Sequence, residues 1–300
     1  MMTVPSPYAD LLARIPLHEH AVTVLGSTTR YWEYGDSAAP TTIVMVHGFR
    51  GDHHGLEPVV AQLSGVRILS PDLPGFGGSE PLRQAAHDID GYARWLSEFV
   101  RQVAPSGRFV LLGHSFGSIV VSAAVAGGLH PDDVVLVNPI AAPALSGPRG
   151  ILTRLAVFYY WAGATLPERL GFALLRNRLI VRVTSLAMVK TSDPALRRWI
   201  HDQHDTYFSA FSDRRVVLEA FQASVSNDVS EFAAAITPRT LLIAADRDDI
   251  TPISAQYTLQ KLFPDASLQV IENVGHLIHY EMPAAAARHL QNFLAEEKTP

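Results

Sequence analysis

Ser115 is the residue whose surroundings point most directly to chemistry. It lies at the centre of Gly113-His114-Ser115-Phe116-Gly117, between a short apolar run and a helical segment of small, apolar residues. A serine on such a sharp strand-to-helix turn projects outward at the carboxyl end of the strand, and the flanking glycines let neighbouring backbone approach closely. The helix that follows directs its positive end toward the same place. The pattern predicts a serine nucleophile.

A serine hydroxyl needs a base, and the base needs a carboxylate that orients it. His276, in Asn273-Val274-Gly275-His276, follows the last apolar run of the chain. The loop at 245–252 follows the preceding run and carries three carboxylates, Asp246, Asp248 and Asp249. Serine, acid and histidine in this chain order are typical of hydrolases with such a turn. The residues therefore predict a Ser–acid–His set with three candidate acids.

Short apolar runs alternate with helical patterns along most of the chain. Each run is nearly continuous in apolar character, which is typical of a strand buried on both faces. Helical spacing is found at 91–104, 116–127 and 284–295, where Pro283 stands at the start of the last helix. The alternation predicts an α/β fold with a mostly parallel central sheet flanked by helices. The predicted strands are Thr41–Val46, Val66–Leu69, Phe109–Leu112, Val134–Val137, Thr240–Ala244 and Leu268–Ile271, with Thr29–Tyr34 as an additional edge strand.

The alternation stops between residues 146 and 225, where helical patterns and aromatic residues dominate. We interpret 146–225 as a helical cap over the carboxyl ends of the strands, inserted into a hydrolase core formed by 1–145 and 226–300. Phe158 and Trp161 in this cap are candidate substrate contacts. Together with Phe116 beside the nucleophile, the aromatic cap favours an apolar substrate.

Five segments resemble the α/β-hydrolase superfamily, and the resemblance extends over nearly the whole chain. They are His47-Gly48-Phe49, Asp72-Leu73-Pro74-Gly75-Phe76-Gly77-Gly78-Ser79, Gly113–Gly117, Asp246–Pro252 and Gly275-His276. Similar proteins carry Gly-x-x-Asp-x-x-x-Pro at the acid loop. Aligning Ala245 with that glycine and Pro252 with that proline makes Asp248 the orienting acid.

The resemblance also implies roles for other residues of these segments. The oxyanion hole is expected from the backbone N–H groups of Phe49 and Phe116. His47 is expected to brace the first loop, and Asp72 to hold turn geometry. Further candidate substrate contacts are His114, beside the nucleophile, and Arg50, which we expect to approach a substrate carboxylate.

Serine at the turn, where dehalogenases and epoxide hydrolases of this fold carry aspartate, implies acyl transfer. We expect a serine hydrolase, of carboxylesterase or lipase type, that cleaves the carboxylic ester of a small or medium apolar substrate without a cofactor. The same residues would serve the hydrolysis of a lactone, a thioester or the carbon–carbon bond of a diketone. Some proteins of this fold act as ligand receptors, so a binding protein is the alternative of another class.

Composition excludes several other classes. The 300 residues carry a net charge of −5, with no run of Lys and Arg that would follow nucleic acid. The absence of cysteine excludes thiolate metal sites, and the adjacent His53 and His54 are not expected to bind metal.

No secretory signal is readable at the amino terminus, so we expect a cytoplasmic protein. The apolar stretch Leu155–Leu166 is too short to span a bilayer. We expect it to pack within the cap and a membrane partner to be unlikely. The alternative is that Arg149, Arg154 and Arg169 dock this stretch at a membrane surface. The physiological substrate and the oligomeric state stay open.

Overall fold

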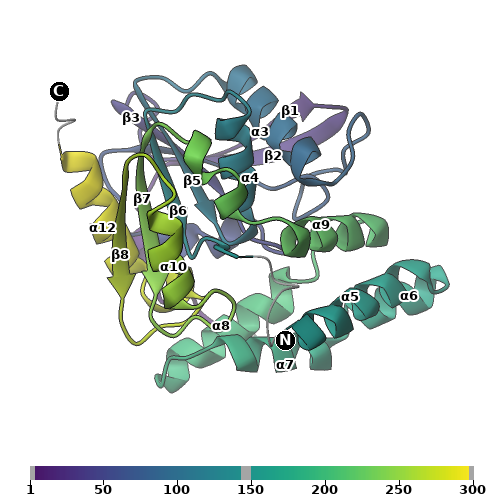
Figure 1. The fold of residues 1–300 in the computed structure, drawn as a ribbon. Helices are drawn as coiled ribbons and strands as arrows, with labels where there is room; N and C mark the ends of the chain where they lie inside the picture. Colours follow the sequence, from purple (N-terminus) through teal and green to yellow (C-terminus); the bar gives the residue numbers. More distant parts are fainter. Residues whose placement is uncertain (1–3, 143–149, 297–300) are drawn as a thin grey trace.

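A computed structural model describes residues 4–142 and 150–296, which contain an eight-stranded sheet (Figure 1). The strands lie in the order β1-β2-β4-β3-β5-β6-β7-β8. From β4 to β8 neighbouring strands are parallel, while β2 is antiparallel to both of its neighbours. The predicted α/β fold with a mostly parallel sheet is confirmed. The strands are β1 (Leu17–Val24), β2 (Ser27–Tyr34), β3 (Thr41–Val46), β4 (Arg67–Pro71), β5 (Arg108–His114), β6 (Asp133–Val137), β7 (Arg239–Ala245) and β8 (Ala266–Ile271).

The antiparallel edge of the sheet differs from the prediction. Thr29–Tyr34, predicted as an edge strand, belongs to β2, which lies inside the sheet between β1 and β4. The edge is β1, whose sequence LHEHAVTV contains three consecutive polar residues and is largely exposed. A strand that covers only one apolar face forms no continuous apolar run, so the search for buried strands missed it.

Helices cover both faces of the sheet. On one face, α3 (Ile89–Val103), α4 (Phe116–Ala126) and α10 (Ile253–Gln260) share an apolar cluster with Val44 and Val46. On the other face, α2 (Glu57–Val60), α11 (Ile278–Glu281) and α12 (Pro283–Ala295) share a second cluster with Ile43 and Met45. Successive strand residues point to opposite faces, so a continuous apolar run serves both clusters. The three predicted helices are present to within two residues at each end.

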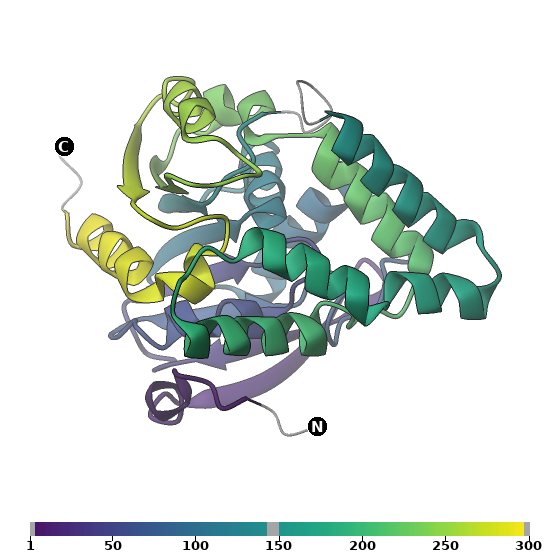
Figure 2. The same ribbon diagram turned by 90° about the horizontal axis from the view of Figure 1, so that it is seen from below.

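Among the described residues, five consecutive helices lie between β6 and β7, and we call them the cap helices. They form the lower part of the molecule in Figure 1, below the sheet, and face the viewer in Figure 2. The proposed boundary between core and cap at 145/146 lies outside the described residues. The cap helices are α5 (Gly150–Thr165), α6 (Glu168–Leu175), α7 (Arg178–Met188), α8 (Pro194–Tyr207) and α9 (Arg214–Ser226). The remaining helical elements are α1 (Ala9–Leu12) and 3₁₀ turns at His53–Gly55, Val229–Glu231 and Ala233–Ala235.

Candidate active site

Ser115 occupies a strained turn between β5 and α4. Its φ of 53° lies in the left-handed region, which residues that carry a Cβ rarely adopt. The glycines on either side are required by close backbone packing. A Cβ on Gly113 would lie 2.4 Å from the carbonyl oxygen of Gly117, and a Cβ on Gly117 would lie 2.3 Å from that of Val46. The turn is thus held tightly against β3, with Ser115 presented at the carboxyl edge of the sheet.

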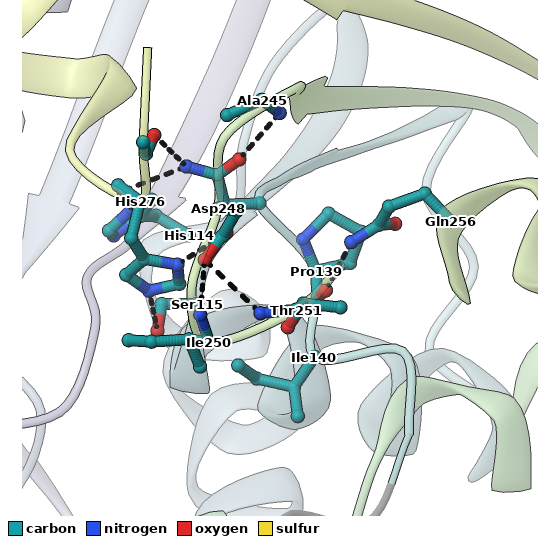
Figure 3. Close-up of polar contacts among 12 residues, drawn as sticks. His114, Ser115, Pro139, Ile140, Ala245, Asp248, Ile250, Thr251, Gln256 and His276 are labelled. Carbon is teal, nitrogen blue, oxygen red and sulfur yellow. Dashed lines mark hydrogen bonds and ion pairs between the residues drawn. The ribbon is translucent and has the colours of Figure 1, made fainter. Parts of the chain in front are cut away.

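The structure brings together the three residues expected to form the Ser–acid–His set (Figure 3). The Oγ atom of Ser115 lies 2.8 Å from Nε2 of His276, and Nδ1 of His276 lies 2.7 Å from Oδ2 of Asp248. The carboxylate can only accept, so Nδ1 carries the proton. Nε2 is then free to accept the hydroxyl proton of Ser115. The arrangement can therefore raise the nucleophilicity of the serine oxygen.

Asp248 is held by its own loop as well as by His276. Its Oδ1 atom accepts hydrogen bonds from the backbone N–H groups of Ile250, at 2.7 Å, and Thr251, at 3.1 Å. Burial alone would raise the pKa of this carboxyl. The His276 ring and the backbone N–H donors outweigh burial, so the pKa is lowered and the carboxylate stays charged.

The two competing carboxylates of the loop lie elsewhere. Asp246 accepts from the backbone N–H of Val274, and Asp249 forms an ion pair with Lys190. Neither is among the residues that the structure places in hydrogen-bond contact with His276. Of the three candidate acids, the geometry therefore favours Asp248.

Two backbone amides remain available beside Ser115. Within the described residues, neither the N–H of Phe49 nor that of Phe116 donates a hydrogen bond. His47 braces the loop before Phe49, because its Nε2 accepts from the backbone N–H of Leu73 at 2.8 Å. These amides suit the two positions expected of an oxyanion hole. The Phe116 side chain is buried against Tyr92 in the core and does not line the cavity, so its ring gives no information about the substrate.

A cavity of about 510 Å³ lies over Ser115 and His276. The cap contributes Leu155, Tyr159 and Tyr160 of α5, residues of α7, and Phe208 and Phe221 to its walls. His114 also lines the cavity, as predicted, and burial lowers its pKa to about 3. The ring is therefore neutral at physiological pH. Polar groups line the cavity from the core and also from the cap, where Thr184 and His204 contribute, but most of its surface is carbon.

Arg50, whose contact with a substrate carboxylate stays a prediction, is bound to the cap. It borders the cavity, but its side chain is buried, and its guanidinium donates to the carbonyl oxygens of Phe208, at 2.8 Å, and Leu175, at 2.9 Å. These carbonyls stand at the carboxyl ends of α8 and α6, where helices leave acceptors unsatisfied. Arg50 therefore joins the loop after β3 to the cap helices, and these contacts use part of its five N–H donors.

Phe158 and Trp161 do not line the cavity, contrary to the prediction. Their side chains are 62% and 50% exposed, while Tyr159 and Tyr160 of the same helix face the cavity. Neighbouring positions on a helix differ by about 100° in direction, so aromatic composition alone could not tell which residues point inward. The expectation that Leu155–Leu166 packs within the cap is therefore wrong for its outward-facing residues.

Asp72 and the paired histidines form a buried network beside the site. Asp72 accepts from the backbone N–H groups of His53, at 2.8 Å, and Gly78, at 2.7 Å, which supports the predicted turn role. Nδ1 of His53 lies 2.9 Å from Asp72 as well. Ligand atoms of Asp52, His53 and His54 come within 4.8 Å of one another. The contact with Asp72 already satisfies Nδ1 of His53, so we assign no metal to this cluster.

Asn138 is a site residue that the sequence analysis did not identify. It follows β6 directly, at a φ of 44°, a conformation that asparagine tolerates better than most residues. Its Nδ2 donates to the carbonyl oxygen of His276 at 2.7 Å, and its Oδ1 accepts from the backbone N–H of Ala245 at 3.1 Å. Asn138 thus connects the His276 loop to the end of β7, where the acid loop begins. The sequence feature that could have indicated Asn138 is its place at the carboxyl end of a predicted strand, beside Pro139.

We expect Asn138→Ala to lower kcat for ester hydrolysis about tenfold to a hundredfold, because the His276 loop loses its anchor. The buried N–H of Ala245 also loses its acceptor, so the free energy of unfolding should fall by about 2 kcal/mol. Asn138→Gly is the matched control, since it removes the same hydrogen bonds but tolerates the positive φ. It should lose activity similarly and stability less. The labelling rate of Ser115 by a fluorophosphonate reports positioning of the base, and a wild-type rate in both variants would contradict the assignment.

Comparisons with known proteins agree with this architecture. A model of the alpha/beta hydrolase family matches residues 43–289. Lipase 1 of Psychrobacter immobilis is 23% identical over 84% of this chain and 76% of its own. The 2-succinyl-6-hydroxy-2,4-cyclohexadiene-1-carboxylate synthase of Salmonella typhimurium is 28% identical over 87% of this chain and 96% of its own. The solved esterase of Exiguobacterium antarcticum superposes with a TM-score of 0.75 at 16% identity, over 93% of this chain and all of the other.

Proposed function

Because the chain belongs to the alpha/beta hydrolase family, we propose that it is a serine hydrolase that cleaves the carboxylic ester of a small or medium apolar substrate. One observation carries the proposal: an unbroken hydrogen-bonded series from Ser115 through His276 to Asp248 at the base of a largely apolar cavity. The lipase and esterase names among the similar proteins support it.

In the proposed reaction, Oγ of Ser115 attacks the ester carbonyl carbon while its proton passes to Nε2 of His276. The negative charge that develops on the carbonyl oxygen is stabilised by the N–H groups of Phe49 and Phe116. The tetrahedral intermediate then expels the alcohol, which takes the proton from Nε2 and leaves an acyl group on Ser115. Water repeats the same steps, releases the carboxylic acid and restores the serine.

The cavity supports an ester of a neutral acid over an anionic substrate. Arg50 is the one arginine or lysine among the described residues that line the cavity, and three of its hydrogen bonds go to the cap. A carboxylate inside this cavity would have to share that guanidinium with its cap partners, and burying a charge without a dedicated partner is costly. Carboxylated diketones therefore fit less well than apolar esters, although the same three residues would serve carbon–carbon bond, lactone or thioester hydrolysis.

A substrate panel tests the proposal. We expect p-nitrophenyl esters of short and medium acyl chains to be hydrolysed with higher kcat/KM than a lactone, a thioester or a diketone. A fluorophosphonate should label the purified chain at Ser115, as established by mass spectrometry. Labelling without turnover of any panel member would support a ligand receptor, and a preference for the diketone would replace ester chemistry with carbon–carbon bond hydrolysis.

A further inference from the structure

Exposed apolar side chains gather on α5, on α7 and on the short helix between them. Fourteen large hydrophobic side chains are exposed in the described residues, and eight of them belong to residues 155–186. An apolar cluster of this kind on a surface commonly marks a site of interaction. We call the eight the cap patch: Leu155, Phe158, Trp161, Leu166, Leu170, Leu179, Val183 and Leu186.

The cap patch follows the outward faces of two helices. On α5 its residues recur at three-residue spacing, and the rings of Phe158 and Trp161 lie 5.6 Å apart. On α7 Leu179, Val183 and Leu186 recur at spacings of four and three, which places them on one face. In Figure 2, α5 and α7 lie on the side nearest the viewer and are joined through α6.

Helix α5 is apolar on both of its faces. Tyr159 and Tyr160 face the cavity, while Phe158 and Trp161 face outward. A helix that is apolar all round is typical of a segment buried in protein or in contact with lipid. The outward face is uncovered in the isolated chain, so we expect it to have a partner. No helix in the described residues is long and apolar enough to cross a membrane.

The charge around the cap patch selects the kind of partner. Residues 150–188 carry five arginines and one glutamate, of which Arg182 is paired with Asp205 of α8, so the segment stays positive although the whole chain carries −5. Arg154 and Arg169 are exposed beside the patch. Apolar and aromatic side chains bordered by arginine are typical of segments that lie in the interface of an anionic membrane. A second copy of the chain would bring a like-charged surface against this one, which disfavours self-association here.

The rim of the cavity adjoins the cap patch. Leu155, Thr184 and Ile250 line the cavity and are also exposed, so they mark where it opens. Leu155 belongs to the cap patch, and Thr184 lies on α7 between patch residues. Contact of the patch with lipid would therefore turn the opening of the cavity toward the lipid.

We propose that the cap patch docks on a membrane surface rich in anionic phospholipid. In the docked state, α5 and α7 lie along the interface, Phe158 and Trp161 enter the boundary between headgroups and acyl chains, and the cavity opens toward the bilayer. This revises the expectation that a membrane partner is unlikely. Docking rests on the cap alone and does not depend on which bond the enzyme cleaves.

Co-sedimentation of the full chain with vesicles tests the docking. We expect binding to phosphatidylcholine vesicles that contain phosphatidylglycerol, and much weaker binding to phosphatidylcholine alone or at high salt. Phe158→Ser with Trp161→Ser should lower the partition coefficient on the mixed vesicles about tenfold or more. Arg154→Gln with Arg169→Gln should lower it about tenfold. Trp161 fluorescence should shift to the blue when vesicles are added, and Trp161→Phe should abolish this shift.

Two controls separate docking from other effects. Tyr257→Ser with Leu262→Ser removes exposed apolar side chains of similar size on the core, and it should bind vesicles as the wild type does. Ser115→Ala should also sediment as the wild type, even if the proposed ester hydrolysis proves wrong. Absence of wild-type binding to the mixed vesicles would overturn the proposal. So would undiminished binding by Phe158→Ser with Trp161→Ser, or a solution dimer that this variant dissociates.

Discussion

Replacing Ser115 with alanine is expected to lower kcat for ester hydrolysis about a millionfold. Ser115 is the one residue among those described whose hydroxyl lies within hydrogen-bond distance of His276. Without that hydroxyl no acyl-enzyme can form. Residual activity of about 10³ to 10⁴ over the uncatalysed reaction should persist, because the free amides of Phe49 and Phe116 can still bind a developing oxyanion.

Turnover of p-nitrophenyl butyrate and fluorophosphonate labelling measure this loss together. Ser122→Ala is the matched control, since Ser122 is a buried serine on α4, the helix that follows Ser115, and its hydroxyl has no partner within the described residues. Its removal should leave activity and fold close to wild type. Ester turnover by Ser115→Ala at more than a hundredth of the wild-type rate would rule out the serine mechanism.

Replacing Asp248 with asparagine is expected to lower kcat about ten-thousandfold, with little change in KM. The carboxylate accepts from Nδ1–H of His276 and so keeps Nε2 unprotonated toward Ser115. An asparagine amide can donate to Nδ1 instead, which places the ring proton on Nε2. A ring in that tautomer cannot take the serine proton. The substitution preserves size, so the loss comes from the proton position and from the missing charge beside the imidazolium.

The neighbouring carboxylates supply the controls for this prediction. Asp246→Asn and Asp249→Asn change the same loop without touching His276, and each should change kcat less than tenfold. Steady-state kinetics on one ester, with a thermal melt for each variant, makes the comparison. A larger loss in either control than in Asp248→Asn would assign the orienting acid to a different residue.

Local sequence patterns were enough to predict much of the core. Runs such as Thr41–Val46 became strands with the predicted bounds, because strands buried on both faces require continuous apolar residues. The turn around Ser115 was equally predictable from the sequence, since close backbone packing leaves no room for a Cβ at Gly113 or Gly117. The edge strand β1 was not predicted because an exposed edge needs no apolar run, and its polar residues at 18–20 look like those of a loop.

The residues of the chain by themselves determined the α/β fold and predicted a serine nucleophile, a histidine base and a short choice of acids, because each depends on a local pattern or on chain order. Only the tertiary structure decided what depends on contacts between distant segments. It set Asp248 against His276, directed Arg50 to carbonyls of the cap and placed Asn138 behind the His276 loop. It also turned Phe158 and Trp161 outward. Helical periodicity shows which residues share a face, but what the rest of the molecule packs against decides which face is buried.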